Sequence, residues 1–180
     1  LDRQIKYNME IAQEGMHNKY GAAVGQTLTK HFSEDITTKA KAYTAAGSDA
    51  RMSGCVLPVV VNSGSGNQGM TVSIPVVLYA EHIGAPEEKL YRALTLSNLL
   101  AIHQKTGIGK LSAYCGAVSA ACAAGAAIAY LHDEPFEVIK DTLTNSLANV
   151  SGIVCDGAKP SCAAKIASSL DAAIMAYMMA

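Results

Sequence analysis

The stretch that decides the fold reads GIGKLSAYCGAVSAACAAGAAIAYL over residues 107–131 and, further on, GIVCDGAKPSC over residues 152–162. Residues 111–131 contain no charged side chain and consist mostly of Ala, Gly, Ser and Cys. A segment of this length could span a bilayer, but its small side chains make it weakly hydrophobic. Small residues also let neighbouring helices pack closely. We therefore expect the buried central helix of a helical bundle rather than a transmembrane span.

Length and composition indicate one globular unit. The chain has 180 residues, half of them hydrophobic and 16% charged, with a net charge of −1. A chain of this size buries a substantial core, and we expect residues 1–180 to form a single domain. Basic residues are neither in excess nor arranged in a stripe, so nucleic acid is not an expected partner.

Cysteine usage indicates a reducing compartment. The chain has five cysteines, an odd number, and none of them forms a CxxC pair. With no secretory leader at the start, free or metal-bound thiols in the cytoplasm are expected, without a membrane partner. The chain begins at Leu1, without a methionine, and continues directly into a helical pattern. We interpret it as part of a larger protein and leave homo-oligomerisation open.

Hydrophobic periodicity predicts an all-α bundle of about eight helices with at most one short strand. Ser33 is a candidate N-cap, Gly47 a candidate helix stop, and Pro58 argues against a central strand in the apolar run 56–61. The expected helices span residues 2–18, 22–32, 34–46, 50–55, 70–83, 86–105, 111–131, 135–150 and 163–179.

Three cysteines, Cys115, Cys155 and Cys162, are candidate metal ligands because thiolates bind soft metals and iron–sulfur clusters. Their spacing matches no ferredoxin or zinc-finger pattern, and cysteine is often a buried core residue, which is the alternative interpretation. Cys155 lies in a turn sequence and Cys162 at an expected helix start, where a thiolate is favoured. Cys55 and Cys122 are expected to be core residues.

The second candidate site is the loop GSGNQG at residues 64–69. Glycines permit close backbone approach, and a following helix would direct N–H groups at an anion. Ser65, Gly66, Asn67 and Gln68 are therefore expected to bind a small carboxylate ligand. The loop lacks the Walker A pattern, so the alternative is an ordinary structural turn.

Two lysines near the cysteines are further candidates. Lys159 and Asp156 either build a solvated turn, or Lys159 offsets the negative charge of thiolates or substrate. Lys110 either neutralises a substrate carboxylate or simply flanks the apolar helix.

Four segments carry a resemblance to a known family: GSDARMSG at 47–54, LPVVVNSGSGNQGMTVSIPV at 57–76, GIGKLSAYCGAVSAACAAG at 107–125 and GIVCDGAKPSCAAK at 152–165. They resemble the iron–sulfur-dependent L-serine dehydratase alpha-chain superfamily, and look closest to its L-cysteine desulfidase branch. The resemblance covers essentially the whole chain, but it matches only the C-terminal half of such proteins.

The resemblance implies a lyase that eliminates the β-substituent of L-cysteine or L-serine, giving pyruvate and ammonia. It implies a [4Fe–4S] cluster held by Cys115, Cys155 and Cys162, with one iron open as a Lewis acid. The general base would lie in the missing N-terminal half, which is thus an expected partner, so no catalytic residue is assigned here. The chain ends Met178-Met179-Ala180, without the terminal cysteine that fills the open iron position in some relatives. A non-catalytic helical module that binds a small anion is the alternative function.

Overall fold

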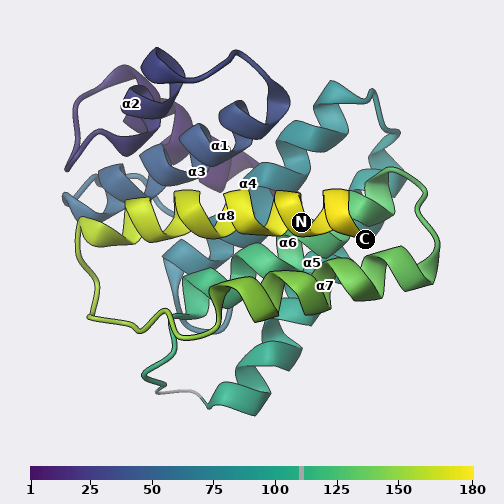
Figure 1. Ribbon diagram of the computed structural model, residues 1–180. Coiled ribbons are helices and arrows are strands. Elements are labelled where there is room, and N and C mark those ends of the chain that lie inside the picture. Colours follow the sequence, from purple (N-terminus) through teal and green to yellow (C-terminus); the bar gives the residue numbers. More distant parts are fainter. Residues whose placement is uncertain (110–111) are drawn as a thin grey trace.

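A computed structural model describes residues 1–109 and 112–180 and shows an all-α protein (Figure 1). Isolated bridges, Asn62 with Ser65 and Tyr114 with Val154, are the only β-type pairing among the described residues. The prediction of an all-α bundle is confirmed. The helices are α1 (Asp2–His17), α2 (Val24–His31), α3 (Ile36–Met52), α4 (Gly66–His82), α5 (Glu87–Ile108), α6 (Gly116–Leu131), α7 (Phe136–Val150) and α8 (Ser161–Met179).

Helix α6 is the centre of the bundle, as its uncharged sequence predicts. It packs against α4, α5, α7 and α8, and nearly all of its residues are buried. Close packing depends on small side chains: a Cβ added at Gly125 would lie 2.9 Å from the Cβ of Ala173 on α8. In the described part of the chain, no helix is both long and apolar enough to cross a membrane.

Helix α3 differs from the expected pattern. This helix was expected to end before Gly47, and a new helix was expected over residues 50–55. Instead, α3 runs unbroken through Gly47 to Met52. Gly47 serves packing instead, because a Cβ there would lie 3.4 Å from the Cα of Ala12 and 3.0 Å from the Sδ of Met70. The cap also differs: the Asp35 carboxylate, not Ser33, accepts the Thr38 N–H at the start of α3.

Helix α4 begins inside the glycine loop rather than after it. The expected start was residue 70, whereas α4 starts at Gly66 and carries Pro75 in its interior. Residues 56–61 are not a strand. The buried Asn8 of α1 holds this region, since its Nδ2 donates to the Gly69 carbonyl at 3.0 Å and its Oδ1 accepts from the Val60 N–H at 2.9 Å.

Three helices begin at the same end of the bundle, which we call the thiol end and define by Gln68 of α4, Cys115 before α6 and Cys162 of α8. In Figure 1, α8 crosses the front of the molecule, with its first turn at this end. Helix α3 runs antiparallel to α8, as the contacts Lys41–Asp171 and Ala45–Ala163 show. The last turn of α3 therefore also lies at the thiol end.

Candidate functional site at the thiol end

Two backbone hydrogen bonds connect the segment that contains Cys115 with the segment that contains Cys155. The Cys155 N–H donates to the Ala113 carbonyl at 2.6 Å, and the Cys115 N–H donates to the Ile153 carbonyl at 3.1 Å. Cys115 is the N-cap of α6 and is 8% exposed, whereas Cys155 is exposed. Two cysteines that are 40 positions apart in the sequence are thereby held in adjacent segments.

Cys162 lies in the first turn of α8, as expected, and is partly exposed. The Nζ of Lys165, one turn further on, donates to the Val154 carbonyl at 3.1 Å and to the Asp156 carboxylate. The hydrogen bond to Asp156 is the main reason why the pKa of Lys165 is raised, and the charges of the Cys115 and Cys162 thiolates raise it further. Lys165 thus joins the first turn of α8 to the segment of Cys155, although sequence reasoning did not single it out.

The glycine loop reaches the thiol end through Gln68. A Cβ added at Gly116, the residue after Cys115, would lie 2.4 Å from the Gln68 Nε2 and 3.0 Å from its Oε1. The Gln68 side chain therefore lies directly against the start of α6. This contact brings two candidate sites, the loop and the first cysteine, into one region.

The other loop residues line the start of α4. Ser65 is the N-cap, but its side chain does not cap the helix. Asn67 is buried, and its Oδ1 accepts from Arg51 Nη1 at 3.3 Å. Gly66 is required, because a Cβ there would lie 2.4 Å from Arg51 Nε. Arg51 is another residue that the sequence analysis missed.

The predicted lysines are less informative. Lys159 is exposed, and its Nζ lies 3.9 Å from the Asp156 Oδ2. This arrangement agrees with the solvated-turn interpretation of Lys159 and Asp156. Lys165 holds the pKa of Asp156 below its usual range. Lys110 lies outside the described residues.

The candidate cysteines do not form a ready site for a single metal ion. In the part of the chain that the structure describes, no three His, Cys, Asp or Glu side chains are grouped to hold one metal ion. A [4Fe–4S] cluster accepts cysteine thiolates that are farther apart, each on a different iron. The three candidate cysteines include two at helix N-termini, where negative charge is favoured, and Lys165 lies near them.

A cavity of about 530 Å³ adjoins Cys115. Cys155 and Cys162 are not among its described lining residues, which are Ile108, Tyr114, Cys115, Val118, Ser119, Leu147, Val150, Ser151, Gly152 and Ile153.

Gln104 lies on the face of α5 between Ala101 and Ile108. Its Nε2 and Oε1 are buried without a hydrogen-bond partner among the described residues. Sequence pattern gave no signal for this unpaired amide.

The remaining cysteines behave as core residues. Cys122 is fully buried in α6, and burial raises the pKa of its thiol to about 12. Cys55 is half-buried and packs beside the core cluster that contains Ile11 and Met70. Core packing therefore accounts for Cys122 and not for the exposed Cys155.

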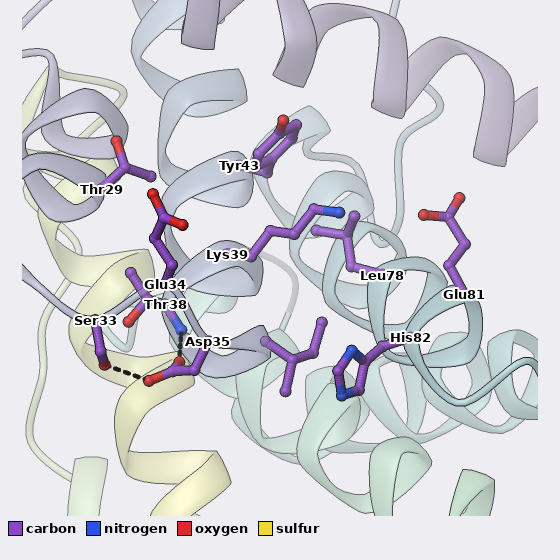
Figure 2. Close-up of a pocket in the computed structure, with 11 residues that line it drawn as sticks. Thr29, Ser33, Glu34, Asp35, Thr38, Lys39, Tyr43, Leu78, Glu81 and His82 are labelled. Carbon is purple, nitrogen blue, oxygen red and sulfur yellow. Dashed lines mark hydrogen bonds between the residues drawn. The ribbon is translucent and has the colours of Figure 1, made fainter.

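A second cleft, of about 500 Å³, lies where α2, α3 and the end of α4 meet. Figure 2 shows the Asp35 carboxylate hydrogen-bonded to Ser33 and to the Thr38 backbone, with Lys39, Glu81 and His82 around the opening. Asp35 is occupied as a helix cap, and its hydrogen bonds lower its pKa. No cysteine is among the described residues that line this cleft. It is therefore a weaker candidate than the thiol end.

Curated relatives of this chain are UPF0597 proteins. A protein of Desulfitobacterium hafniense is 60% identical over 99% of the chain, and one of Lachnoclostridium phytofermentans is 62% identical over 99%. YhaM of Escherichia coli is 44% identical over 97% of the chain. The chain covers 42%, 43% and 41% of these relatives, so it spans less than half of their length.

The family comparison covers every residue. The sequence model of the serine dehydratase alpha-chain family matches residues 1–180, in agreement with the resemblance carried by the four segments. No solved structure matches the chain. From the extent of the family match, the chain belongs to the serine dehydratase alpha-chain family.

Proposed function

We propose that this chain is the cluster-binding part of a β-eliminating amino-acid lyase that acts on L-cysteine or L-serine. The single observation that carries the proposal is that the segments of Cys115 and Cys155 are hydrogen-bonded to each other, next to the contact between Gln68 and the start of α6. Membership of the serine dehydratase alpha-chain family supports the reaction class. Exposed and partly exposed thiols fit the reducing cytoplasm, where they remain free to bind iron.

In this proposal Cys115, Cys155 and Cys162 hold a [4Fe–4S] cluster, which supplies a Lewis acid when bound. The starts of α6 and α8 stabilise the negative charge of two of the thiolates. Lys165, which is hydrogen-bonded to Asp156, adds a positive charge close to the same thiols. The chain itself therefore balances part of the negative charge that three thiolates bring together.

The start of α4 binds the substrate. Its free N–H groups and the amides of Asn67 and Gln68 suit a carboxylate. The substrate loses its α-proton to a base and its β-substituent as water or sulfide. The resulting aminoacrylate takes up water to give pyruvate and ammonia. We place the base outside this chain, in the part of the longer relatives that the chain does not cover.

Anaerobic reconstitution with iron and sulfide tests the cluster. We expect about 4 Fe per chain and a broad absorbance in the blue visible range, as three-cysteine ligation of a cubane cluster requires. Cys155→Ala should abolish both signals, and the matched control Cys122→Ala should keep them because Cys122 is a core residue. Failure of the wild-type chain to take up iron would contradict the proposal.

The substrate is decided by a second assay. A polypeptide of the full length of the relatives, kept under argon, should release pyruvate from L-cysteine, from L-serine or from both. Comparison of the two kcat/KM values identifies the leaving group. A reconstituted protein that produces no pyruvate from either amino acid excludes the lyase function.

One observation favours the alternative, a non-catalytic module that binds a small anion. The described residues hold no ready group of three ligands for a metal ion, whereas the anion-binding features of α4 need no metal. This alternative expects carboxylate binding without iron uptake, and the reconstitution experiment separates the two.

A further inference from the structure

Arg51 extends from the last turn of α3 onto the first turn of α4. Its Nη1 donates to the Asn67 Oδ1 at 3.3 Å, and a Cβ on Gly66 would lie 3.0 Å from its Cζ as well as 2.4 Å from its Nε. The guanidinium therefore lies in direct contact with the start of a 17-residue helix. Glycine at position 66 lets the guanidinium take this place, since a Cβ would displace Arg51 or Val59.

Two helix ends act on Arg51. The last turn of α3, to which Arg51 belongs, favours a cation, whereas the start of α4 carries a partial positive charge and favours an anion. The first turn of α4 contains no acidic residue. Among the described residues, no carboxylate forms an ion pair with Arg51. The guanidinium and the start of α4 are therefore both free to bind an anion.

A second, independent feature also indicates a ligand. The Gln68 side chain is only 7% exposed and lies against Gly116, yet it has no hydrogen bond within the described ranges. The Asn67 side chain is 5% exposed and uses its Oδ1 for Arg51, which leaves its Nδ2 as a free donor in the described structure. These amide donors make no hydrogen bond to the described residues and are not fully shut off from solvent, so they are available to an acceptor from outside.

We propose that Arg51 binds the α-carboxylate of the amino-acid substrate. Asn67 orients the guanidinium, and the Gln68 amide and the first N–H groups of α4 complete the carboxylate site. Arg is suited to this role because its planar guanidinium binds a carboxylate through two parallel hydrogen bonds. The identity of the substrate rests on the proposed function, whereas the need for an anion rests on the contacts of Arg51 and Gln68.

The arrangement also sets the direction of the substrate. Gln68 spans from the start of α4 to the residue after Cys115. A carboxylate held by Arg51 at one side of Gln68 leaves the rest of the amino acid on the side of Cys115. Arg51 is thereby a binding residue that selects α-amino acids over the corresponding amines.

Binding by the reconstituted chain tests this role, with L-serine and ethanolamine, which lacks the carboxylate, as probes. Calorimetric titration should show that Arg51→Gln weakens L-serine binding about 10- to 100-fold, as expected for a lost hydrogen bond to a charged group. Arg51→Lys should recover only part of the affinity, because an ammonium cannot form the bidentate pair. The weaker binding of ethanolamine should stay unchanged in both variants.

Controls separate this proposal from the proposed function. Arg92→Gln, on an exposed arginine of α5 that is paired with Glu88, should bind L-serine like the wild type. Iron content and visible absorbance should be equal in wild type and in both Arg51 variants. Equal L-serine affinity in wild type and Arg51→Gln, or no L-serine binding by the wild type, overturns the Arg51 assignment. If iron uptake fails but L-serine binding depends on Arg51, the lyase proposal fails and the Arg51 site stands.

Discussion

Cys122 and Cys162 lie in two contrasting regions of the same bundle. Cys122 lies about two turns inside α6, in the main core cluster, and its sulfur contacts the Val118 carbonyl at 3.5 Å. Cys162 is in the first turn of α8, partly exposed and beside the cation Lys165. The two cysteines are the same residue type, so their places in the helices account for the burial of Cys122 and the partial exposure of Cys162.

Thiol alkylation gives the largest expected difference, here between the buried Cys122 and the exposed Cys155. In the iron-free chain, iodoacetamide should label exposed Cys155 at least about a thousandfold faster than Cys122, because Cys122 reacts only when the fold opens. Since the pKa of Cys122 is raised to about 12, its native thiol stays protonated from about pH 7 to pH 9. Mass spectrometry of labelled peptides over time measures both rates. Comparable labelling of Cys122 and Cys155 in the native chain would show that the interior of α6 is open.

Serine substitution sharpens the comparison at the level of stability. Cys122→Ser should lower the free energy of unfolding by about 1–2 kcal/mol, because it places a hydroxyl in an apolar interior. Cys162→Ser should change it by less than about 0.5 kcal/mol, because the residue is partly exposed and serine suits a helix start. Urea denaturation of the iron-free chain measures both values.

In reconstitution with iron, the variant with the larger effect should be Cys162→Ser rather than Cys122→Ser. Cys122→Ser should take up iron normally, whereas Cys162→Ser should not, because a serine cannot replace the third thiolate. A Cys162→Ser chain with full iron content and unchanged absorbance removes Cys162 from the ligand set, while the comparison of stabilities remains valid.

The sequence was sufficient to predict the helical class, the central place of α6 and the burial of Cys122, but not the place of Cys115 in the main core cluster. The run of uncharged small residues and the turn around Cys155 are local signals, and local patterns report burial and turns well. Gly47 was misread because a helix-ending glycine and a glycine that allows close packing look the same in one sequence. Its partners, Ala12 and Met70, are supplied by other helices.

The missed site residues share one physical cause. Arg51 contacts Asn67, and Lys165 contacts Val154, only because α3 and α8 run antiparallel and end or begin at the thiol end. Such contacts depend on how helices are arranged, which periodicity within one segment does not encode. The unpaired state of Gln104 is likewise visible only when its neighbours are known.

Gln104 and Gln26 give the smallest and most discriminating comparison. Both are half-buried glutamines, but Gln26 Nε2 donates to the carbonyls of Gly15, Met16 and Asn18, whereas the Gln104 amide has no partner in the described chain. Gln26→Leu should lower the free energy of unfolding by about 1–2 kcal/mol, because it leaves carbonyls unpaired. Gln104→Leu should raise it by up to about 1 kcal/mol, because an apolar side chain avoids burying an unpaired amide. Urea denaturation of the ligand-free chain measures both changes in the free energy of unfolding. If Gln104→Leu lowers that free energy as much as Gln26→Leu does, Gln104 already has a partner, such as a buried water between α5 and α6.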